Sequence, residues 1–399
     1  MMLFLKPSKN TYLFLVLSLI FGMTIFGQKK INSIKVGSER FELYLPLLEG
    51  KKVGIVGNHT SIILKKNKEN DFTHLVDTLL SLNIQVKKLF SPEHGFRGNA
   101  DAGELIVDGK DTKTGLEIVS LYAENKKPTA TQLAEIEIMV FDLQDVGVRF
   151  FTYISTLHYV LEACGELNIP VIILDRPNPN AHYIDGPVLE LEHTSFVGLH
   201  KVPVVYGMTI GEYGQMIVGE KWLMNEVQCD VTVIPIHNYN HKKRYSLPVK
   251  PSPNLPNDKS INLYPSLCFF EGTNVSVGRG TETQFQIYGS PFLNDREFQF
   301  IPKPNSGSKY PKHEGLICYG KDLREIDDLE QINLEWLLDT YQQNTYENPY
   351  FTIFFTKLAG TKKLQEQIEQ GFTEGEIRKT WKDDLRDFKE IRKKYLIYK

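Results

Sequence analysis

Short apolar runs alternate with helical patterns between residues 51 and 180. Buried strands are expected at 53–57, 86–90, 138–143 and 171–174. Apolar positions with helical spacing occur between them, at 72–82 and 152–167. Strands that alternate with helices of 10 to 15 residues are typical of βαβ units. The pattern therefore predicts an α/β fold with a mainly parallel sheet.

The alternation weakens after about residue 200, where Pro, Asn and Tyr become frequent. The elements expected there are a strand at 231–235, helices at 333–345 and 374–395, and a strand at 350–357. The charged run at 382–394 is expected to be a solvated helix face. We predict a smaller α+β domain at 251–399, which follows an α/β domain at 28–250.

The first 27 residues have the pattern of a secretory signal peptide. Lys6 and Lys9 precede an apolar run that ends at Phe26, and the small residue Gly27 follows. This run is short for a membrane span, although an uncleaved anchor is an alternative. We expect cleavage near Gly27 and a periplasmic or secreted protein without stable membrane insertion.

Composition and charge narrow the class of protein. The chain has 399 residues, 41% hydrophobic and 24% charged, which excludes a disordered or disulfide-scaffold protein. A net charge of −3 does not favour nucleic acid as a partner. The widely spaced cysteines are expected to be buried thiols rather than zinc ligands, although their pairing stays open. They are Cys164, Cys229, Cys268 and Cys318.

Polar clusters follow the first predicted strands, at the positions where an open parallel sheet binds its ligands. They are Asn58-His59-Thr60-Ser61, Ser91-Pro92-Glu93-His94-Gly95, Asp142-Leu143-Gln144-Asp145 and Asp175-Arg176-Pro177-Asn178. Because the carboxyl ends of parallel strands lie at one edge of a sheet, these clusters should converge. The sequence therefore predicts a functional cleft at this edge.

Glu93 is the strongest candidate for a catalytic acid. Pro92 stiffens the turn and Gly95 permits unusual backbone angles, so this turn would hold Glu93 at a strand tip where it could deliver a proton. The structural alternative is that Glu93 caps a helix or pairs with Arg97. His94 could position Glu93, contact substrate or bond the loop backbone.

Two further clusters have a structural and a functional interpretation. Asp145 and Arg149 are four residues apart, so they could form a local ion pair or bind substrate. Asp175 precedes Arg176, whose guanidinium suits a planar carboxylate. Both interpretations stay open from these residues alone.

A glycosidase needs two carboxylates, and a second candidate is Glu271 in the Gly-rich segments of 270–281. Arg279 there would add an anion contact. The candidate metal ligands are His59, His94 and Asp142. No HExxH, P-loop, GxGxxG or GxSxG motif occurs, so we expect no metal and no bound cofactor.

These clusters belong to a longer series of ordered motifs. The series is VGNHTS (56–61), FSPEHGFRG (90–98), FDLQDVGVRFFTYISTL (141–157), LDRPNP (174–179), DGP (185–187), SFVG (195–198), YGMTIGE (206–212), PSPNLP (251–256), FEGTNVSVGRGT (270–281) and RKKYLIY (392–398). The series spans the expected mature chain. It resembles the NamZ-type exo-β-N-acetylmuramidases, once a family of unknown function.

The resemblance implies a Rossmann-like N-terminal domain, a smaller C-terminal domain and an active cleft between them. It also implies hydrolysis of terminal, non-reducing β-1,4-linked N-acetylmuramic acid (MurNAc) from peptidoglycan-derived disaccharides or glycan chain ends, as in cell-wall recycling. Glu93 would be the general acid, and the second catalytic group is open among Glu271, Asp142, Asp145 and the substrate's acetamido oxygen. The implied substrate-binding residues are Asn58, His59, His94, Asp145, Arg149, Asp175, Arg176, Asn254, Asn274 and Arg279.

The implied substrate adds requirements for its pocket. The lactyl carboxylate of MurNAc calls for a cation, and the candidates are Arg149, Arg176 and Arg279. The N-acetyl group calls for an apolar wall, and the candidates are Phe96, Phe151 and Tyr153. Tyr206 departs from the family pattern, where His or a similar polar residue is expected. The alternatives to this enzyme are a muropeptide-binding protein that does not cleave and a metal-dependent hydrolase.

Overall fold

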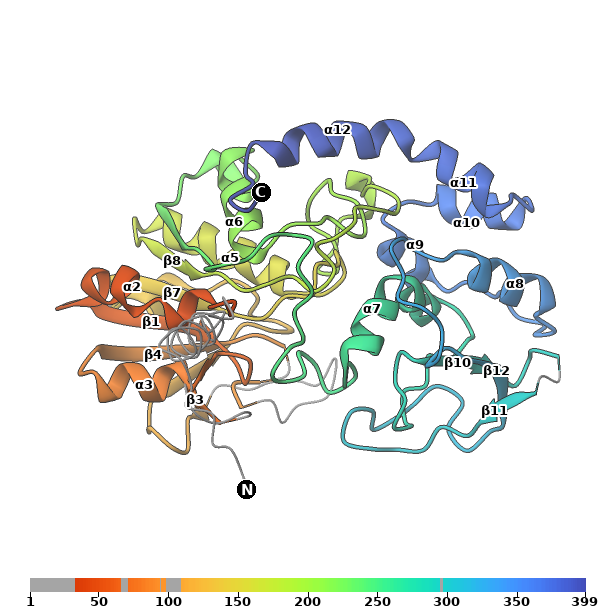
Figure 1. Cartoon of the computed structure of the whole chain (residues 1–399), viewed down its shortest axis with the longest axis horizontal. Helices are drawn as coiled ribbons and strands as arrows, with labels where there is room; N and C mark the ends of the chain where they lie inside the picture. The colour runs from red at the N-terminus through yellow and green to blue at the C-terminus, as the bar shows by residue number, and fades with distance from the viewer. Residues whose placement is uncertain (1–32, 66–70, 94, 98–108, 295–296) are drawn as a thin grey trace, which may run out of the picture. The chain divides into compact units, whose positions relative to one another are not determined.

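The N-terminal part of the chain is built around a seven-stranded sheet in the computed structural model (Figure 1). Its order is β5-β6-β4-β1-β7-β8-β9, and all neighbouring pairs are parallel except β5 with β6. The strands are β1 Lys52–Gly57, β4 Gln85–Ser91, β5 Gly109–Lys110, β6 Glu117–Ser120, β7 Ile138–Asp142, β8 Val171–Leu174 and β9 Val231–Ile234. The predicted α/β class with a mainly parallel sheet is confirmed.

The structure describes residues 33–65, 71–93, 95–97, 109–294 and 297–399. The expected signal peptide at 1–27 and the candidate His94 lie outside these residues. In the described ranges, no helix combines the length and the apolar character that a bilayer span requires.

The parallel strands follow the Rossmann order. From β1 the chain builds outward through β4 and β6, then returns to place β7, β8 and β9 on the other side of β1. The order reverses between β1 and β7, where Gly57 pairs with Asp142. Loops that leave these two strands diverge, so a crevice is expected at their carboxyl ends.

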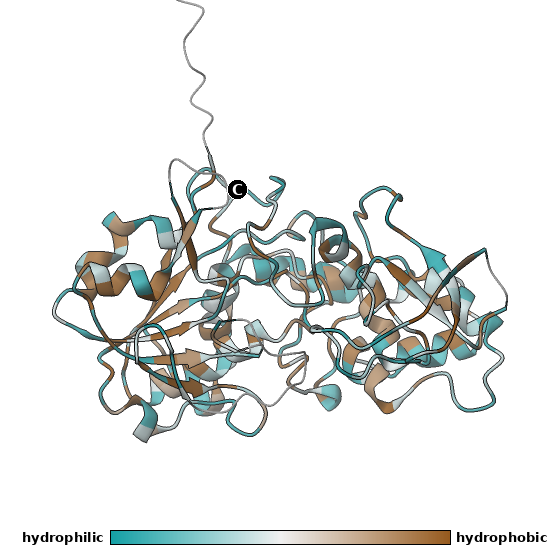
Figure 2. Cartoon of the chain, turned by 90° about the horizontal axis from the view of Figure 1, so that it is seen from below, coloured by the Kyte–Doolittle hydropathy of each residue, from teal (hydrophilic) through white to brown (hydrophobic). Residues whose placement is uncertain are grey.

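The central strands are buried on both faces, which explains their continuous apolar runs. Ile138 and Val140 of β7 pack in one core with α2 and α3, whereas Met139 and Phe141 pack with α5 in the other. This alternation is the two-residue period of a strand between two helix layers. The same strands are largely brown in Figure 2. The helices are α2 Phe41–Leu48, α3 Leu75–Ser81, α4 Ala130–Leu133, α5 Tyr153–Glu166 and α6 Ile210–Gly219.

The C-terminal part contains a three-stranded antiparallel sheet of order β10-β12-β11. Its strands are β10 Ile287–Ser290, β11 Phe298–Phe300 and β12 Cys318–Asp322. The helices of this part are α7 Asp258–Leu267, η4 Cys268–Gly272, α8 Glu335–Gln343, α9 Ile353–Ala359, α10 Lys363–Glu369, α11 Glu374–Thr380 and α12 Lys382–Lys393. A small hairpin pairs β2 Ile62–Leu64 with β3 Phe72–His74 near the first strands.

The predicted strand at 350–357 is wrong, because most of this segment is helix α9. Thr352 caps the helix by accepting a hydrogen bond from the Phe354 amide, and Gly360 ends it with a φ of 72°. These two caps outweigh the strand preference of the aromatic residues between them. The predicted helix at 374–395 is divided at Trp381 into α11 and α12.

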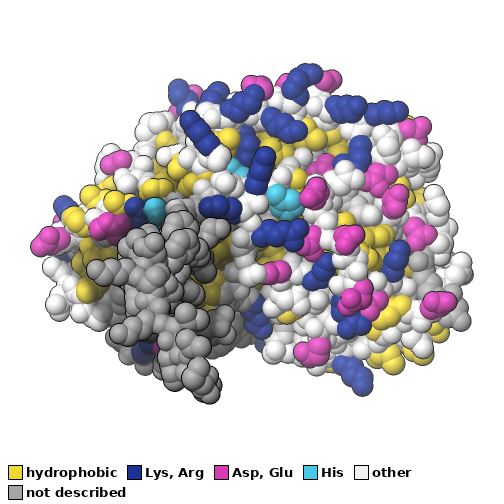
Figure 3. Space-filling model, in the orientation of Figure 1, with side chains coloured by type: hydrophobic (Ala, Val, Ile, Leu, Met, Phe, Trp, Pro, Cys, Tyr) yellow, Lys and Arg dark blue, Asp and Glu magenta, His cyan; other side chains and the backbone are white. Residues whose placement is uncertain are grey.

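The charged run at 382–394 forms α12, and its charges are satisfied locally. Phe388 is its one buried residue, and Arg386 pairs with Asp383 at 2.6 Å. Basic and acidic side chains mix along this edge of the molecule (Figure 3). The run is a solvated helix face, as expected.

The C-terminal residues return to the parallel sheet. The Tyr398 hydroxyl donates to Asp175 Oδ2 at 2.6 Å, and the Glu212 carboxylate accepts from the amide of Ile397 at 2.8 Å. The final motif of the sequence therefore anchors the chain end beside β8. All four cysteines are free and buried, as expected.

Candidate active site

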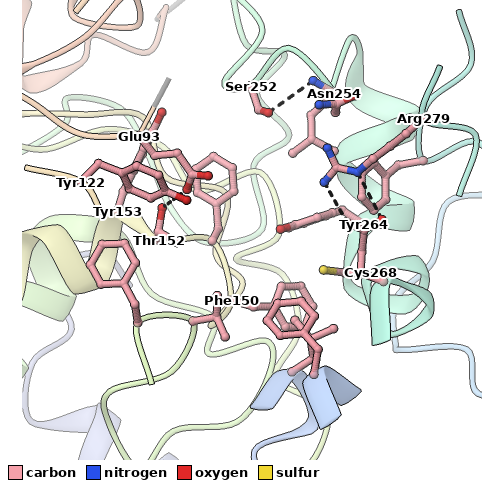
Figure 4. A pocket seen from close by; sticks show the side chains of 18 of the residues that line it. Glu93, Tyr122, Phe150, Thr152, Tyr153, Ser252, Asn254, Tyr264, Cys268 and Arg279 are labelled. Atoms are coloured by element: carbon pink, nitrogen blue, oxygen red, sulfur yellow. Dashed lines mark hydrogen bonds and ion pairs between the residues drawn. The ribbon is translucent and has the colours of Figure 1, made fainter. Parts of the chain in front are cut away.

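A pocket of about 710 Å³ opens beside the carboxyl edge of the parallel sheet. One wall comes from loops after β4, β6 and β7, and includes Glu93, Tyr122 and Thr152. The other wall comes from the C-terminal part and includes Glu271 and Arg279. Figure 4 shows the two walls facing each other across the pocket.

Glu93 is held in the first wall by hydroxyl groups. Thr152, which precedes α5, donates its Oγ1 hydrogen to Glu93 Oε2 at 2.8 Å. Burial, the charge of Glu93 and a hydrogen bond with Glu93 all raise the pKa of Tyr122, so this phenol stays protonated and donates. Arg97, the predicted alternative partner, instead binds Asp111 with two contacts of 2.9 and 2.7 Å. The hydroxyl groups of Thr152 and Tyr122 thus orient the Glu93 carboxyl group, which lines the pocket.

Glu271 in the opposite wall is paired with a cation. Arg279 donates Nε to Glu271 Oε1 at 3.2 Å, and its Nη2 lies 3.1 Å from Oε2. The guanidinium also lies over the ring of Phe285, 5.2 Å from its centroid. Both oxygens of this carboxylate therefore face Arg279, which balances the charge of the pair.

Lys312 fixes the turn that carries Glu271, although the sequence analysis did not select it. Its ammonium group donates to three backbone carbonyls, at 2.6 to 3.1 Å. These carbonyls belong to Phe270, Thr273 and Val275. The role of Lys312 is to hold η4 and the following loop in place.

Asn254 lines the pocket, and its neighbours hold its side chain and backbone. Its Nδ2 donates to the carbonyl of Gly307 at 2.6 Å, and its backbone amide donates to Ser252 Oγ at 3.3 Å. The Oδ1 atom is buried and has no hydrogen-bond partner among the described residues. An amide N–H of a ligand would satisfy it.

Asp142 and Arg176 do not line the pocket, because they form a buried ion pair with each other. The two contacts are 2.6 Å from Nε to Oδ1 and 2.9 Å from Nη2 to Oδ2. Arg176 Nη2 also donates to the carbonyl of Ile62 at 3.1 Å. This pair ties β7 to the loop after β8.

Arg149 and Asp145 are buried and have separate partners. Arg149 donates to four backbone carbonyls at 2.7 to 2.9 Å, and burial lowers its pKa to about 9. Asp145 accepts from the Gly147 amide at 2.7 Å and from the Tyr206 hydroxyl, and burial raises its pKa to about 6. The possible ion pair between Asp145 and Arg149 is absent. The hydroxyl of Tyr206 thus binds Asp145, and Tyr206 does not line the pocket.

Three other candidates occupy positions behind or beside the pocket. Asn58 donates to the hydroxyl of Tyr153, a lining residue, at 2.7 Å. Asp175 is buried beneath the C-terminal tail, and burial raises its pKa to about 7. His59 donates Nε2–H to the Lys250 carbonyl at 2.8 Å.

Asn274 does not line the pocket, and its Nδ2 donates to Asn344 Oδ1 at 2.8 Å. Phe151 and Tyr153 line the pocket as predicted for an apolar wall, whereas Phe96 packs against His74 in the other core. Within the described residues, no group of three or more His, Cys, Asp or Glu side chains is placed to hold a metal ion.

The sequence analysis missed the segment of the pocket that follows β6. Tyr122 and Lys126 come from this segment, and both line the pocket. The strand Glu117–Ser120 is short and half polar, so it was not predicted, and its carboxyl end was not examined. Glu93 was selected because it follows the carboxyl end of a predicted parallel strand. The same criterion would have selected Tyr122 and Lys126 if β6 had been predicted.

Comparisons with known proteins agree with this architecture. The family model described as "Exo-beta-N-acetylmuramidase NamZ, N-terminal" matches residues 53–259, and the corresponding C-terminal model matches 262–398. The chain is 35% identical over 376 residues to the peptidoglycan β-N-acetylmuramidase NamZ of Bacillus subtilis (strain 168), covering 89% of each protein.

Solved structures with this architecture are also known. One DUF1343 family protein of Bacteroides fragilis has 43% identity and a TM-score of 0.84, over 92% of this chain and 99% of that one. A second protein of the same family and organism has 29% identity and a TM-score of 0.79, over 92% and 100%. The similarity therefore extends over nearly the whole chain.

Proposed function

Since the chain belongs to the family of NamZ exo-β-N-acetylmuramidases, which are glycosidases, we propose that it cleaves terminal MurNAc from peptidoglycan fragments in the pocket that contains Glu93. The observation that carries this proposal is the environment of Glu93. Its carboxyl group lines a large pocket, and the hydroxyl groups of Thr152 and Tyr122 orient it.

Glu93 is proposed as the general acid. Cleavage of a glycosidic bond requires a proton at the leaving oxygen and negative charge near the anomeric carbon. The hydroxyl groups of Thr152 and Tyr122 fix the orientation of the Glu93 carboxyl group, which favours directed proton delivery. The negative charge near the anomeric carbon would come from Glu271 or from the substrate's acetamido oxygen.

The remaining lining residues suit an N-acetylated sugar. Asn254 Oδ1 offers a buried acceptor for the acetamido N–H, and Phe151 offers an apolar surface for the methyl group. The signal-peptide pattern of residues 1–27 supports a location outside the cytoplasm. The proposed substrate is therefore a fragment whose non-reducing end carries MurNAc.

The test is release of free sugar by the purified protein from two disaccharides of opposite order. We expect MurNAc to be released from MurNAc-GlcNAc, and no sugar from GlcNAc-MurNAc, as measured by liquid chromatography with mass spectrometry. Binding of MurNAc-GlcNAc without release would identify a muropeptide-binding protein instead. Release from the reversed disaccharide would contradict the proposed specificity.

A further inference from the structure

We propose that Lys126 binds the lactyl carboxylate of MurNAc and thereby selects this sugar over N-acetylglucosamine (GlcNAc). The inference rests on the proposed function and assigns a residue to its specificity. MurNAc differs from GlcNAc by a lactyl ether at O3, which adds one carboxylate. A cation in the pocket that has no internal partner is the group that would recognise this difference.

Of the two cations that line the pocket, one has no carboxylate partner among the described residues and could bind a ligand carboxylate. Among the described lining residues, the charged ones are Glu93, Lys126, Glu271 and Arg279. Arg279 faces both oxygens of Glu271. No carboxylate in the described part of the chain lies within ion-pairing distance of Lys126, whereas the adjacent Lys127 contacts two. Lys126 is therefore the lining cation whose charge is uncompensated within these residues.

The arginines that the sequence suggested for this task have other partners. Arg149 donates to four backbone carbonyls in the core. Arg176 is committed to Asp142. Neither residue lines the pocket, so neither can reach a carboxylate there without breaking these contacts.

Aromatic contacts place Lys126 on the same wall as Glu93. The ammonium group of Lys126 lies 5.3 Å from the centroid of the Phe196 ring. This ring meets the ring of Tyr122 edge-on, with centroids 6.0 Å apart, and Tyr122 is hydrogen-bonded to Glu93. Ser155 Oγ donates to the Phe196 carbonyl at 2.7 Å, which fixes the backbone beneath the ring. The cation is thus held in position before a ligand arrives.

The substituents of one sugar ring would engage both groups. C1, where the acid acts, and C3, which carries the lactyl ether, flank the same carbon of the MurNAc ring. A sugar with C1 beside Glu93 and C3 toward Lys126 therefore uses two groups that the same wall holds together. Its acetamido group at C2 would lie between them.

The test combines variants of the enzyme with variants of the substrate. Three 4-nitrophenyl β-glycosides are compared: MurNAc, its lactyl methylamide and GlcNAc. We expect Lys126→Met to lower kcat/KM for the MurNAc glycoside by roughly 10- to 100-fold, mainly through KM, to the level of the methylamide. Lys126→Arg should restore most of the preference. Lys127→Met is the matched control and should keep the wild-type ratio between substrates.

Several outcomes would overturn the assignment. Equal losses on all three glycosides would show general damage to the pocket, and an unchanged ratio would show that another group reads the carboxylate. A fourth substrate carries a peptide stem on the lactyl group. If Lys126→Met affects this substrate alone, the recognised carboxylate belongs to the stem and the assignment fails.

A binding measurement shows whether this inference or the proposed function has failed. Calorimetry measures the affinity of wild type and Lys126→Met for free MurNAc and its methylamide, without any cleavage. We expect roughly tenfold tighter binding of the free acid in the wild type only. Absence of glycosidase activity together with this preference would reject the function and keep Lys126. Equal affinities would reject Lys126 whatever the activity.

Discussion

Asp142 and Glu93 both follow strands of the same parallel sheet, yet their carboxylates lie in different surroundings. Asp142 ends β7, is fully buried, and binds Arg176 through both oxygens. Glu93 follows β4, is half-buried in the pocket wall, and is oriented by Thr152. The comparison teaches that the partner decides the role of a carboxylate. An ion-paired, buried carboxylate holds the scaffold, whereas one that hydroxyl groups orient beside an open pocket can exchange a proton with a ligand.

The largest expected effect is a loss of activity when the pocket carboxylate Glu93 is changed. Glu93→Gln keeps the size of the side chain but removes its acid, so kcat for MurNAc-GlcNAc should fall by about 10²- to 10⁴-fold. The unfolding midpoint should stay close to that of the wild type, because the side-chain oxygen of Gln can still accept the hydrogen bond from Thr152. Glu124→Gln, an exposed change in the loop after β6, is the matched control. Full activity of Glu93→Gln would move the acid to another residue.

The second effect separates the regions by stability. Arg176→Met leaves Asp142 buried without its cation, which should lower the free energy of unfolding by about 3–5 kcal/mol in urea titrations. The double change Asp142→Leu with Arg176→Met should recover part of this loss, because it removes the uncompensated charge. If Arg176→Met instead abolishes activity in a protein of unchanged stability, the pair belongs to the site.

The sequence predicted the strands best where both faces of a strand are buried. β1, β7 and β8 are apolar on both faces, so continuous hydrophobic runs marked them without knowledge of their neighbours. The segment 350–357 misled the analysis because aromatic residues favour strands. The capping bonds of Thr352 and Gly360, which decide for a helix, depend on local geometry.

The candidate site was predictable only in part, for a similar reason. Glu93, Glu271, Asn254 and Arg279 line the pocket, as their positions in the motifs suggested. The presence of an arginine near a strand end, as with Arg149, does not reveal which groups its guanidinium will bind. Four carbonyls distant in the sequence accept its hydrogen bonds, and only the folded chain brings them together.

A third, smaller effect tests Asp145, a buried carboxylate that one hydroxyl group stabilises. Burial raises the pKa of Asp145 to about 6, above its unfolded value of about 3.9. The stability from this group is therefore fully present below about pH 4 and is lost as the pH rises through about 6. The Tyr206 hydroxyl favours the ionised form, so Tyr206→Phe should raise the pKa further and increase this loss.

We expect Tyr206→Phe to lower the free energy of unfolding by about 1–2 kcal/mol at pH 8, and by less at pH 4. Tyr183→Phe is the control, because the hydroxyl of Tyr183 is buried without a hydrogen-bond partner among the described residues. Urea titrations at both pH values give the comparison. A loss that is the same at pH 4 and pH 8 would show that the Tyr206 hydroxyl contributes by packing alone.

The smallest expected effect comes from comparing two ion pairs that have the same contact distance but differ in burial. Arg386 lies 2.6 Å from Asp383 on α12, the same distance as the Nε contact of Arg176 with Asp142. The Arg386 side chain is 65% exposed, against 3% for Arg176. Water and salt screen the exposed pair, so Arg386→Ala should leave the urea midpoint unchanged within error. A loss as large as that of Arg176→Met would mean that contact geometry, rather than desolvation, sets the strength of both pairs. The division between scaffold and pocket carboxylates by burial and partner would then fail.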